Sequence, residues 1–169
     1  MNYDECKDYV FNKYGKKIKS IMTTNEALAK YNFISKVIMK SETGELSKEL
    51  KVKIMSMRIE LSKIKKSYEE DTKAFAEQII TDDFRTLAQK QDKTDEEYNE
   101  YVTQEAKINE AYNEYLRQLG TKEVVTKASL TETEYEDLMK VNIANDVEIN
   151  GQKINSGDFL EIIYDLFVE

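Results

Sequence analysis

Residues 50–68 read LKVKIMSMRIELSKIKKSY, and their large apolar side chains recur at alternating intervals of four and three residues. This spacing places the side chains in one stripe along a helix, which is the heptad pattern of helices that pack side by side. The stripe consists of Leu50, Ile54, Met57, Leu61, Ile64 and Tyr68. Asp71 interrupts it and Phe75 restores it, so the pattern predicts one long helix over about residues 45–80.

A second stripe of the same kind follows near residue 95. Thr81 with the two acids after it is typical of a helix start, which predicts a kink near residue 81. Thr94 and Glu97 form a capping box, and Gly120 predicts the end of a helix over about residues 95–119. Its stripe consists of Tyr98, Tyr101, Ile108, Tyr112, Tyr115 and Leu119. We expect the two long helices to form an antiparallel, coiled-coil-like hairpin; the alternative is a helix that continues through residue 81.

Charge is divided along the chain. Residues 1–68 carry 15 Lys and Arg against 8 Asp and Glu, a net charge of +7, whereas residues 69–169 carry 10 against 25, a net charge of −15. Residues 48–68 have a net charge of +5 and residues 69–120 one of −8. Each fully buried large side chain contributes roughly 1.5–3 kcal/mol and each exposed ion pair about 0–1 kcal/mol, so we expect burial to hold the hairpin. Opposite charge is expected to select its alignment, with the basic start of one helix facing the acidic late part of the other.

Two shorter helices are predicted before the hairpin. Residues 3–14 favour a short helix that Gly15 ends. Thr23 and Glu26 form another capping box, because a Thr hydroxyl and a Glu carboxylate three residues apart satisfy opposite backbone N–H groups. This box predicts a helix over about residues 24–40.

Short strands and helices alternate after the hairpin. Residues 123–126 read EVVT and favour a strand, and Thr131 caps a predicted helix over about residues 131–141. Residues 147–154 alternate in hydropathy around an Asn-Gly pair, which is typical of a β-hairpin with a two-residue turn. A last helix is expected to start near residue 156.

These patterns predict a mainly α fold, in which a long antiparallel helical hairpin carries a small α+β C-terminal cap with a β-hairpin. We expect a short N-terminal helix and connector in residues 1–22, the helical body in residues 23–120, and the cap in residues 121–169.

The sequence contains no catalytic signature. It has no His and a single cysteine, Cys6, so the usual ligands of zinc and haem are missing. Nucleophile motifs and phosphate-binding glycine loops are missing as well. Residues 146–151 imitate the start of a calcium loop, but Gly157 stands where the bidentate acid is required, which favours the β-hairpin. We therefore expect no catalytic residue, no cofactor and no metal, and predict that the protein is not an enzyme.

Paired carboxylates offer one alternative to that prediction. Asp82 and Asp83, or the acids of residues 95–97, could serve acid–base chemistry or hold magnesium. They stand at predicted helix starts, where negative charge stabilises the helix, so we interpret them as capping and solvated residues.

Eight residues of the two stripes are candidates for contact with a partner. They are Met57, Leu61, Ile64 and Tyr68 of the first long helix, and Tyr98, Tyr101, Tyr112 and Tyr115 of the second. Tyrosine is common at interfaces because its ring packs while its hydroxyl finds a polar partner. The alternative is that both stripes are used up inside one chain.

The compartment and the class of partner follow from composition. No apolar run approaches the roughly 20 residues that span a bilayer, and the acidic residues 1–5 lack the apolar core of a signal peptide. The overall net charge of −8 disfavours general nucleic-acid binding. We expect a soluble protein of a bacterial cytoplasm or a virion, which binds other protein subunits as a homo- or hetero-oligomer, without membrane or direct nucleic-acid contact.

In layout the chain resembles small helical proteins of phages and prophages from AT-rich bacteria. The shared features are a helix pair that is Ile/Lys-rich and then Glu/Tyr-rich, and an acidic α+β tail that includes residues 147–149 and 159–163. The resemblance covers about residues 24–169 and implies a capsid, connector or tail component, or an assembly protein, that acts through protein–protein contacts. The alternative is a small acidic inhibitor or regulator, whose residues 69–169 would occupy a basic nucleic-acid groove on a host protein.

Overall fold

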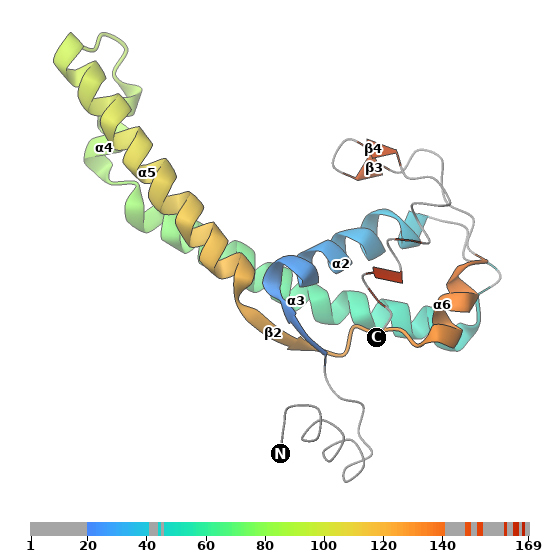
Figure 1. Ribbon diagram of the computed structural model, residues 1–169. Coiled ribbons are helices and arrows are strands. Elements are labelled where there is room, and N and C mark those ends of the chain that lie inside the picture. The colour runs from blue at the N-terminus through green and yellow to red at the C-terminus, as the bar shows by residue number, and fades with distance from the viewer. Residues whose placement is uncertain are drawn as a thin grey trace, which may run out of the picture.

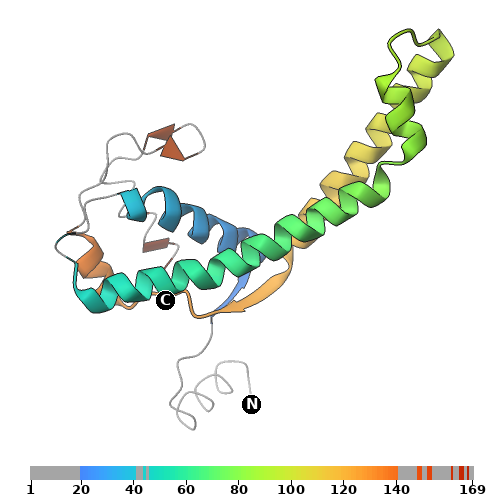
Figure 2. The same ribbon diagram turned by 180° about the vertical axis from the view of Figure 1, so that it is seen from behind.

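One helix, α3 (Lys48–Ile79), runs through both parts of the molecule in the computed structural model (Figure 1, Figure 2). Its first half lies in a globular head. Its second half continues into a projecting helical hairpin, residues 69–121, which we call the arm. The structure describes residues 20–40, 44, 46–140, 148–149, 152–153, 161, 164–165 and 167.

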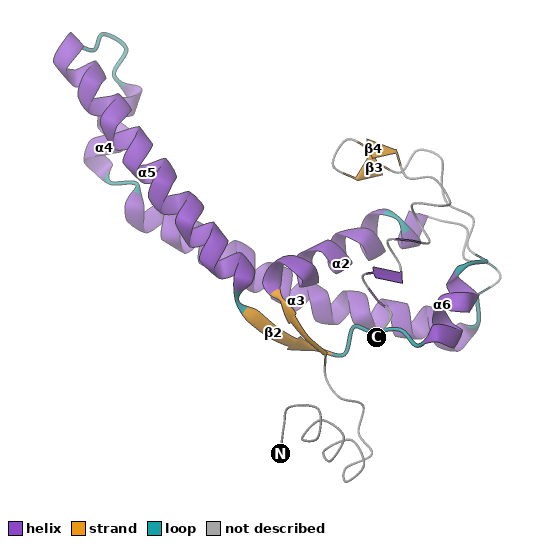
Figure 3. Ribbon diagram, viewed as in Figure 1, coloured by secondary structure: helices purple, strands orange, loops and turns teal. Residues whose placement is uncertain are grey.

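Helices dominate the described residues, and the predicted mainly α fold with a long helical hairpin is confirmed (Figure 3). Besides α3 the elements are β1 (Ser20–Thr23), α2 (Thr24–Lys36), the 3-10 helix η1 (Ile38–Lys40), α4 (Asp82–Gln89), α5 (Asp95–Thr121), β2 (Glu123–Thr126), α6 (Glu132–Leu138), β3 (Glu148–Ile149) and β4 (Gln152–Lys153). The kink predicted near residue 81 is also confirmed, because α3 ends at Ile79 and Thr81 caps α4.

The capping boxes predicted at Thr23 and Thr94 are present, and the helix cap predicted at Thr131 is a capping box as well. Thr23, Thr94 and Thr131 each accept a hydrogen bond from the backbone N–H three residues later, and the Glu at that position accepts one from the threonine's own N–H. The reciprocal bonds satisfy donors that a helix start leaves free, so they fix where α2, α5 and α6 begin.

The core of the head forms where α2 packs along the first half of α3. Phe33 and Ile34 of α2 and Leu61 of α3 are at most 2% exposed. Ala128, Leu130, Leu138 and Phe167 close the core from the C-terminal side. Phe167 lies 6.1 Å from the ring of Phe33, and its carbonyl accepts a hydrogen bond of 2.8 Å from the Leu130 N–H.

A two-stranded antiparallel sheet joins the start of α2 to the end of α5. Ser20 pairs with Thr126 and Thr23 with Glu123, and the Thr24 N–H donates to the Lys122 carbonyl at 2.9 Å. Strand β1 spans the predicted boundary at residue 22, and the sheet joins the two sides of the predicted boundary at residue 120. Strand β2 pairs with β1, and Leu138 of α6 packs in the core of the head.

The arm is a hairpin of α5 against the second half of α3 and α4. Phe75 of α3 stacks on Tyr115 of α5, and Phe84 of α4 stacks on Tyr101. In this register α5 ends beside Ile64 and Tyr68, so the earlier part of α3 has no α5 residue to face and packs on α2.

The predicted charge alignment is therefore wrong. The basic residues 48–61 lie in the head, and no ion pair joins α3 to α5, two helices described in full.

Helix α5 continues one residue past Gly120, to Thr121, instead of ending before the glycine. The backbone of Gly120 lies against α2, and a Cβ atom at this position would come within 2.5 Å of the Asn25 Oδ1 atom. Gly120 thus permits a close approach of the two helices and does not act as the helix terminator that its sequence position suggested.

In the C-terminal region the predicted β-hairpin is present as β3 and β4, with Ile149 opposite Gln152. The turn residues 150–151, the calcium-like residues 146–147 and the predicted helix at residues 3–14 lie outside the described residues.

Candidate interaction surface

The eight candidate contact residues divide into three groups in the structure. Met57 and Leu61 are 3% and 0% exposed and pack in the head core. They cannot meet a partner while the head is folded, so the structure corrects their assignment to a binding surface. The alternative interpretation, that this part of the stripe is used inside the chain, is the one the structure favours.

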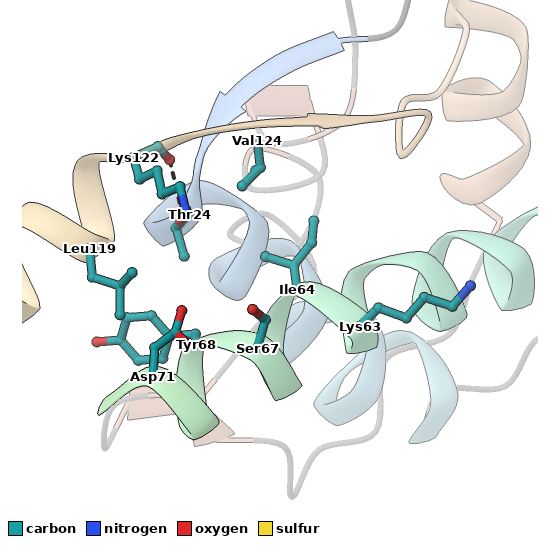
Figure 4. Close-up of a pocket in the computed structure, with 9 residues that line it drawn as sticks. All are labelled: Thr24, Lys63, Ile64, Ser67, Tyr68, Asp71, Leu119, Lys122 and Val124. Atoms are coloured by element: carbon teal, nitrogen blue, oxygen red, sulfur yellow. Dashed lines mark hydrogen bonds between the residues drawn. The ribbon is translucent and has the colours of Figure 1, made fainter. Parts of the chain in front are cut away.

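Ile64 and Tyr68 line a pocket at the junction of head and arm (Figure 4). Its volume is about 260 Å³. The lining residues are Thr24, Lys63, Ile64, Ser67, Tyr68, Asp71, Leu119, Lys122 and Val124. The Thr24 hydroxyl donates to the Lys122 carbonyl at 3.0 Å, which ties two walls of the pocket together.

Three of the four candidate tyrosines are half-buried inside the arm. The Tyr115 ring lies 4.0 Å from that of Phe75, and the Tyr101 ring lies 5.6 Å from that of Phe84. The Tyr101 hydroxyl donates to Glu105 at 2.7 Å, and this bond to a carboxylate raises the pKa of Tyr101. Tyr101 and Tyr115 therefore help to hold the arm together, since stacked rings stabilise beyond the area they bury, and Tyr112 is half-buried on the same helix.

Tyr98 is the remaining candidate, and it is 58% exposed. Val102, one turn further along α5, is 43% exposed. Tyr98, Val102 and the exposed Ala106 follow one another at four residues, so they lie on one side of α5. We call these three residues the arm outer face.

Several charged side chains of the arm form ion pairs with residues close to them in the sequence. The Lys90 ammonium lies 2.5 Å from the Glu97 carboxylate across the tip of the hairpin, and its hydrogen bond lowers the pKa of Glu97. Arg117 makes two hydrogen bonds to Glu114 and lowers the pKa of that carboxyl to about 2. Residues 69–121 carry 14 acids against 6 bases, so these pairs leave the arm strongly acidic.

Sequence reasoning missed a second exposed strip, on α3 within the head. Val52, Met55 and Ile59 are 61%, 39% and 53% exposed. They follow one another at three and four residues and lie on the side of α3 opposite the buried stripe. The signal was present in the sequence, because residues 50–61 carry apolar side chains on two faces of the predicted helix.

Two further kinds of site, a metal cluster and a membrane-spanning helix, were looked for among the described residues. Their His, Cys, Asp and Glu side chains nowhere gather in a group of three that could hold a metal ion. Among the helices that the structure describes, none combines the length and the apolar composition needed to cross a bilayer.

Comparison with known proteins adds no relative. A scan against protein-family models found no match, and neither the curated proteins nor the solved structures gave one. The resemblance to helical phage proteins therefore stays a prediction.

Proposed function

We propose that the protein is a structural or assembly protein that binds another protein subunit through its arm. The observation that carries this proposal is the arm itself, which projects from the head (Figure 1). Its Tyr98 and Val102 side chains are exposed. Exposed aromatic and branched apolar side chains on a protruding element are typical of contact sites.

The distribution of buried side chains supports this role. The fifteen buried apolar residues that form the core of the described chain include none between residues 62 and 127. The arm is thus not needed to complete the head core, and its own side chains are mostly half-buried or exposed. A long hairpin that adds so little to the core is best explained as an element that contacts another protein.

The setting we propose for this contact is a phage particle or its assembly, as the resemblance in layout implies. A capsid, connector or tail component binds neighbouring subunits and carries out no chemistry, which agrees with the absence of catalytic motifs from the sequence.

The acidity of the arm favours one other function. An elongated element with 14 acids and 6 bases could occupy a basic nucleic-acid groove on a host enzyme. In that case double-stranded DNA would compete for the partner, and binding would weaken steeply as salt rises. A contact made mainly by the apolar side chains of Tyr98 and Val102 would weaken less with rising salt and would be displaced less by DNA.

Site-specific photo-crosslinking tests the main proposal. A photoreactive residue at Ala106, which is exposed on the arm outer face, is expected to give a defined cross-linked product in cells that express the natural partners. The same residue at Met139, which is 46% exposed on the head, serves as the control. The Ala106 product should disappear in a Tyr98→Ala/Val102→Ala variant. Equal products from both positions, or none from Ala106, would contradict a contact through the arm.

A further inference from the structure

The exposed strip on α3 lies on a single side of that helix. Val52, Met55 and Ile59, which we call the α3 outer face, fall within a sector of about 60°, because each residue turns an α-helix by about 100°. Figure 2 shows the first half of α3 in front of α2, which packs against the buried stripe. Three large apolar side chains in a row are therefore open to solvent.

A small apolar pocket opens beside this strip. Its volume is about 190 Å³, and its lining residues are Ile38, Met39, Leu46, Lys51, Ile54 and Met55. Met55 belongs both to the pocket and to the α3 outer face, so the two are continuous. Met39, which η1 contributes, is 46% exposed. Methionine side chains are flexible and polarisable, and they are common where a surface accepts the apolar groups of a partner.

Positive charge flanks the apolar strip. Lys48 lies inside the same sector of α3, at its N-terminal end, and Lys63 lies about 20° outside it, at the other end. Both lysines are exposed, and neither forms an ion pair with another described residue. The exposed Lys51 lines the pocket. Glu49 is the one exposed acid of residues 48–63, and it lies about 60° outside the sector.

We propose that the α3 outer face binds an acidic amphipathic helix of another protein, which inserts a large apolar side chain into the pocket beside Met55. Charge complementarity favours this occupant, since acids at the two ends of such a helix would meet Lys48 and Lys63. The two lysines are fifteen residues apart, or roughly 22 Å along α3, which is the length of about four helical turns. Apolar groups at every third or fourth residue of the partner helix would match the spacing of the strip.

This contact goes beyond the proposed function, because it lies on the head and uses no residue of the arm. Two copies of the α3 outer face would bring like charges together, which disfavours self-association through it. A protein with both contacts would join two different partners, one bound by the arm and one bound by the head.

Two synthetic peptides test the proposal. Both are helices of about four turns with the same row of leucines; one carries glutamates beside the row, and the other carries lysines at the same positions. Fluorescence anisotropy of each labelled peptide, titrated with the full chain, measures binding. We expect the acidic peptide to bind at least about tenfold more tightly than the basic one, and its binding should weaken as salt rises.

Removal of apolar side chains assigns the binding to one surface. Val52→Ala/Ile59→Ala should lower the affinity for the acidic peptide at least about tenfold, because it removes exposed apolar area from the α3 outer face. Tyr98→Ala/Val102→Ala removes exposed apolar side chains from the arm and is the matched control, which should bind the peptide as the wild type does. Circular dichroism checks that every variant is folded.

Charge reversal tests the two lysines. Lys48→Glu/Lys63→Glu should reverse the preference between the acidic and the basic peptide. Lys107→Glu/Lys127→Glu makes the same charge change at exposed lysines of α5 and of the segment after β2, and it should keep the preference of the wild type.

Methyl NMR locates the acidic peptide on the head. The methyl signals of Met39 and Met55 should shift when the peptide is added, because both side chains line the pocket. Met139, which directly follows α6 and is 46% exposed, is the control and should not shift.

The proposal is overturned if neither peptide binds, if both bind equally, or if the Tyr98→Ala/Val102→Ala variant loses the acidic peptide. Vesicles of phosphatidylglycerol are a third probe: shifts of Met39 and Met55 with vesicles but not with the acidic peptide would assign the face to a membrane surface instead. Shifts that depend on the concentration of the protein alone would assign it to a second copy. The arm contact is tested separately, by the cross-link from Ala106.

Discussion

The head and the arm use the same helix in two different ways. In the head, α3 buries Leu50, Ile54, Met57 and Leu61 almost completely against α2 and the C-terminal segments. In the arm, the same helix offers half-buried side chains such as Phe75, which stack on aromatic partners. A continuous heptad stripe therefore supports a dense core at one end and an open two-helix contact at the other.

The ion pairs of the head and of the arm also differ, in how far apart their partners lie in the sequence. The one ion pair between distant parts of the described sequence, Lys53 with Glu134, lies in the head, where it joins α3 to α6. Those of the arm join residues that are close in the sequence, as in Arg117 with Glu114. Among the described residues, the head thus has a long-range ion pair, while the ion pairs of the arm are local and its two sides are joined by stacked rings.

A cavity in the head core should produce the largest effect. Leu61→Ala removes a side chain that is 0% exposed, and we expect it to lower the free energy of unfolding by about 2–5 kcal/mol. Ile59→Ala, two residues away and 53% exposed, should change it by less than about 0.5 kcal/mol. Urea denaturation followed by circular dichroism measures both. Equal losses would show that the head does not depend on this core.

Loss of a stacked ring in the arm should have a smaller and local effect. Phe75→Ala is expected to weaken the arm by roughly 1–2 kcal/mol, since it removes a half-buried ring and the stacking contact of that ring with Tyr115. Hydrogen exchange should then show faster exchange in α5 with unchanged protection in α2. Tyr98→Ala, which removes an exposed ring from the same arm, is the control and should leave exchange unaltered. If α2 loses protection as well, the head and the arm do not differ in the way described here.

The close approach of α5 to α2 gives a prediction for the junction between the two regions. Gly120→Ala places a Cβ within 2.5 Å of the Asn25 side chain, and we expect a destabilisation of about 1 kcal/mol. In an Asn25→Ala background the same substitution should be neutral or stabilising, because alanine favours a helix over glycine. Denaturation of the four proteins of this double-mutant cycle gives the coupling energy. A coupling of zero would mean that the two helices do not approach as closely as described.

The smallest expected effect is a pH-dependent change in stability through Glu134, the glutamate of the α6 capping box. Partial burial alone would raise the pKa of Glu134, but the hydrogen bonds from Lys53 and Thr131 outweigh it and lower the pKa. A carboxyl whose pKa is lower in the folded state stabilises the protein above its unfolded pKa, and this stabilisation is lost as pH falls through the folded pKa. Glu134→Gln should therefore cost up to about 1 kcal/mol at pH 7, and the difference from wild type should shrink in acid.

Denaturation at several pH values measures this difference. Glu132→Gln, at an exposed residue of the same helix, provides the comparison. A Glu134→Gln difference that persists unchanged below pH 3 would contradict the assignment of the ion pair to the head.

Local chemistry made much of the fold predictable from the sequence. The capping boxes at Thr23, Thr94 and Thr131 depend on two residues three apart, so they could be read directly. The strand at residues 123–126 and the kink at residue 81 depend on equally short patterns. Each of these predictions is confirmed.

Pairing between distant segments could not be predicted in the same way. The stripe from Leu50 to Phe75 keeps the same heptad spacing throughout, with Asp71 at one position, so it does not reveal that its partner changes from α2 to α5 near residue 64. Exposed ion pairs contribute too little to set such a register, which is why the predicted charge alignment failed. For the candidate site the consequence is direct: Met57 and Leu61 belong to the core, and Tyr98 is the one candidate that is mostly exposed.

Helix α3 has no break between residues 48 and 79, so the arm continues from the head at a defined length. Each residue added to both of its helices would lengthen it by about 1.5 Å and rotate its tip by about 100°. Seven residues in each helix would thus extend the reach by roughly 10 Å and restore nearly the same facing direction, whereas three or four would turn the tip aside. If the arm binds another subunit as proposed, the number of heptads in the arm sets the distance between that subunit and the head.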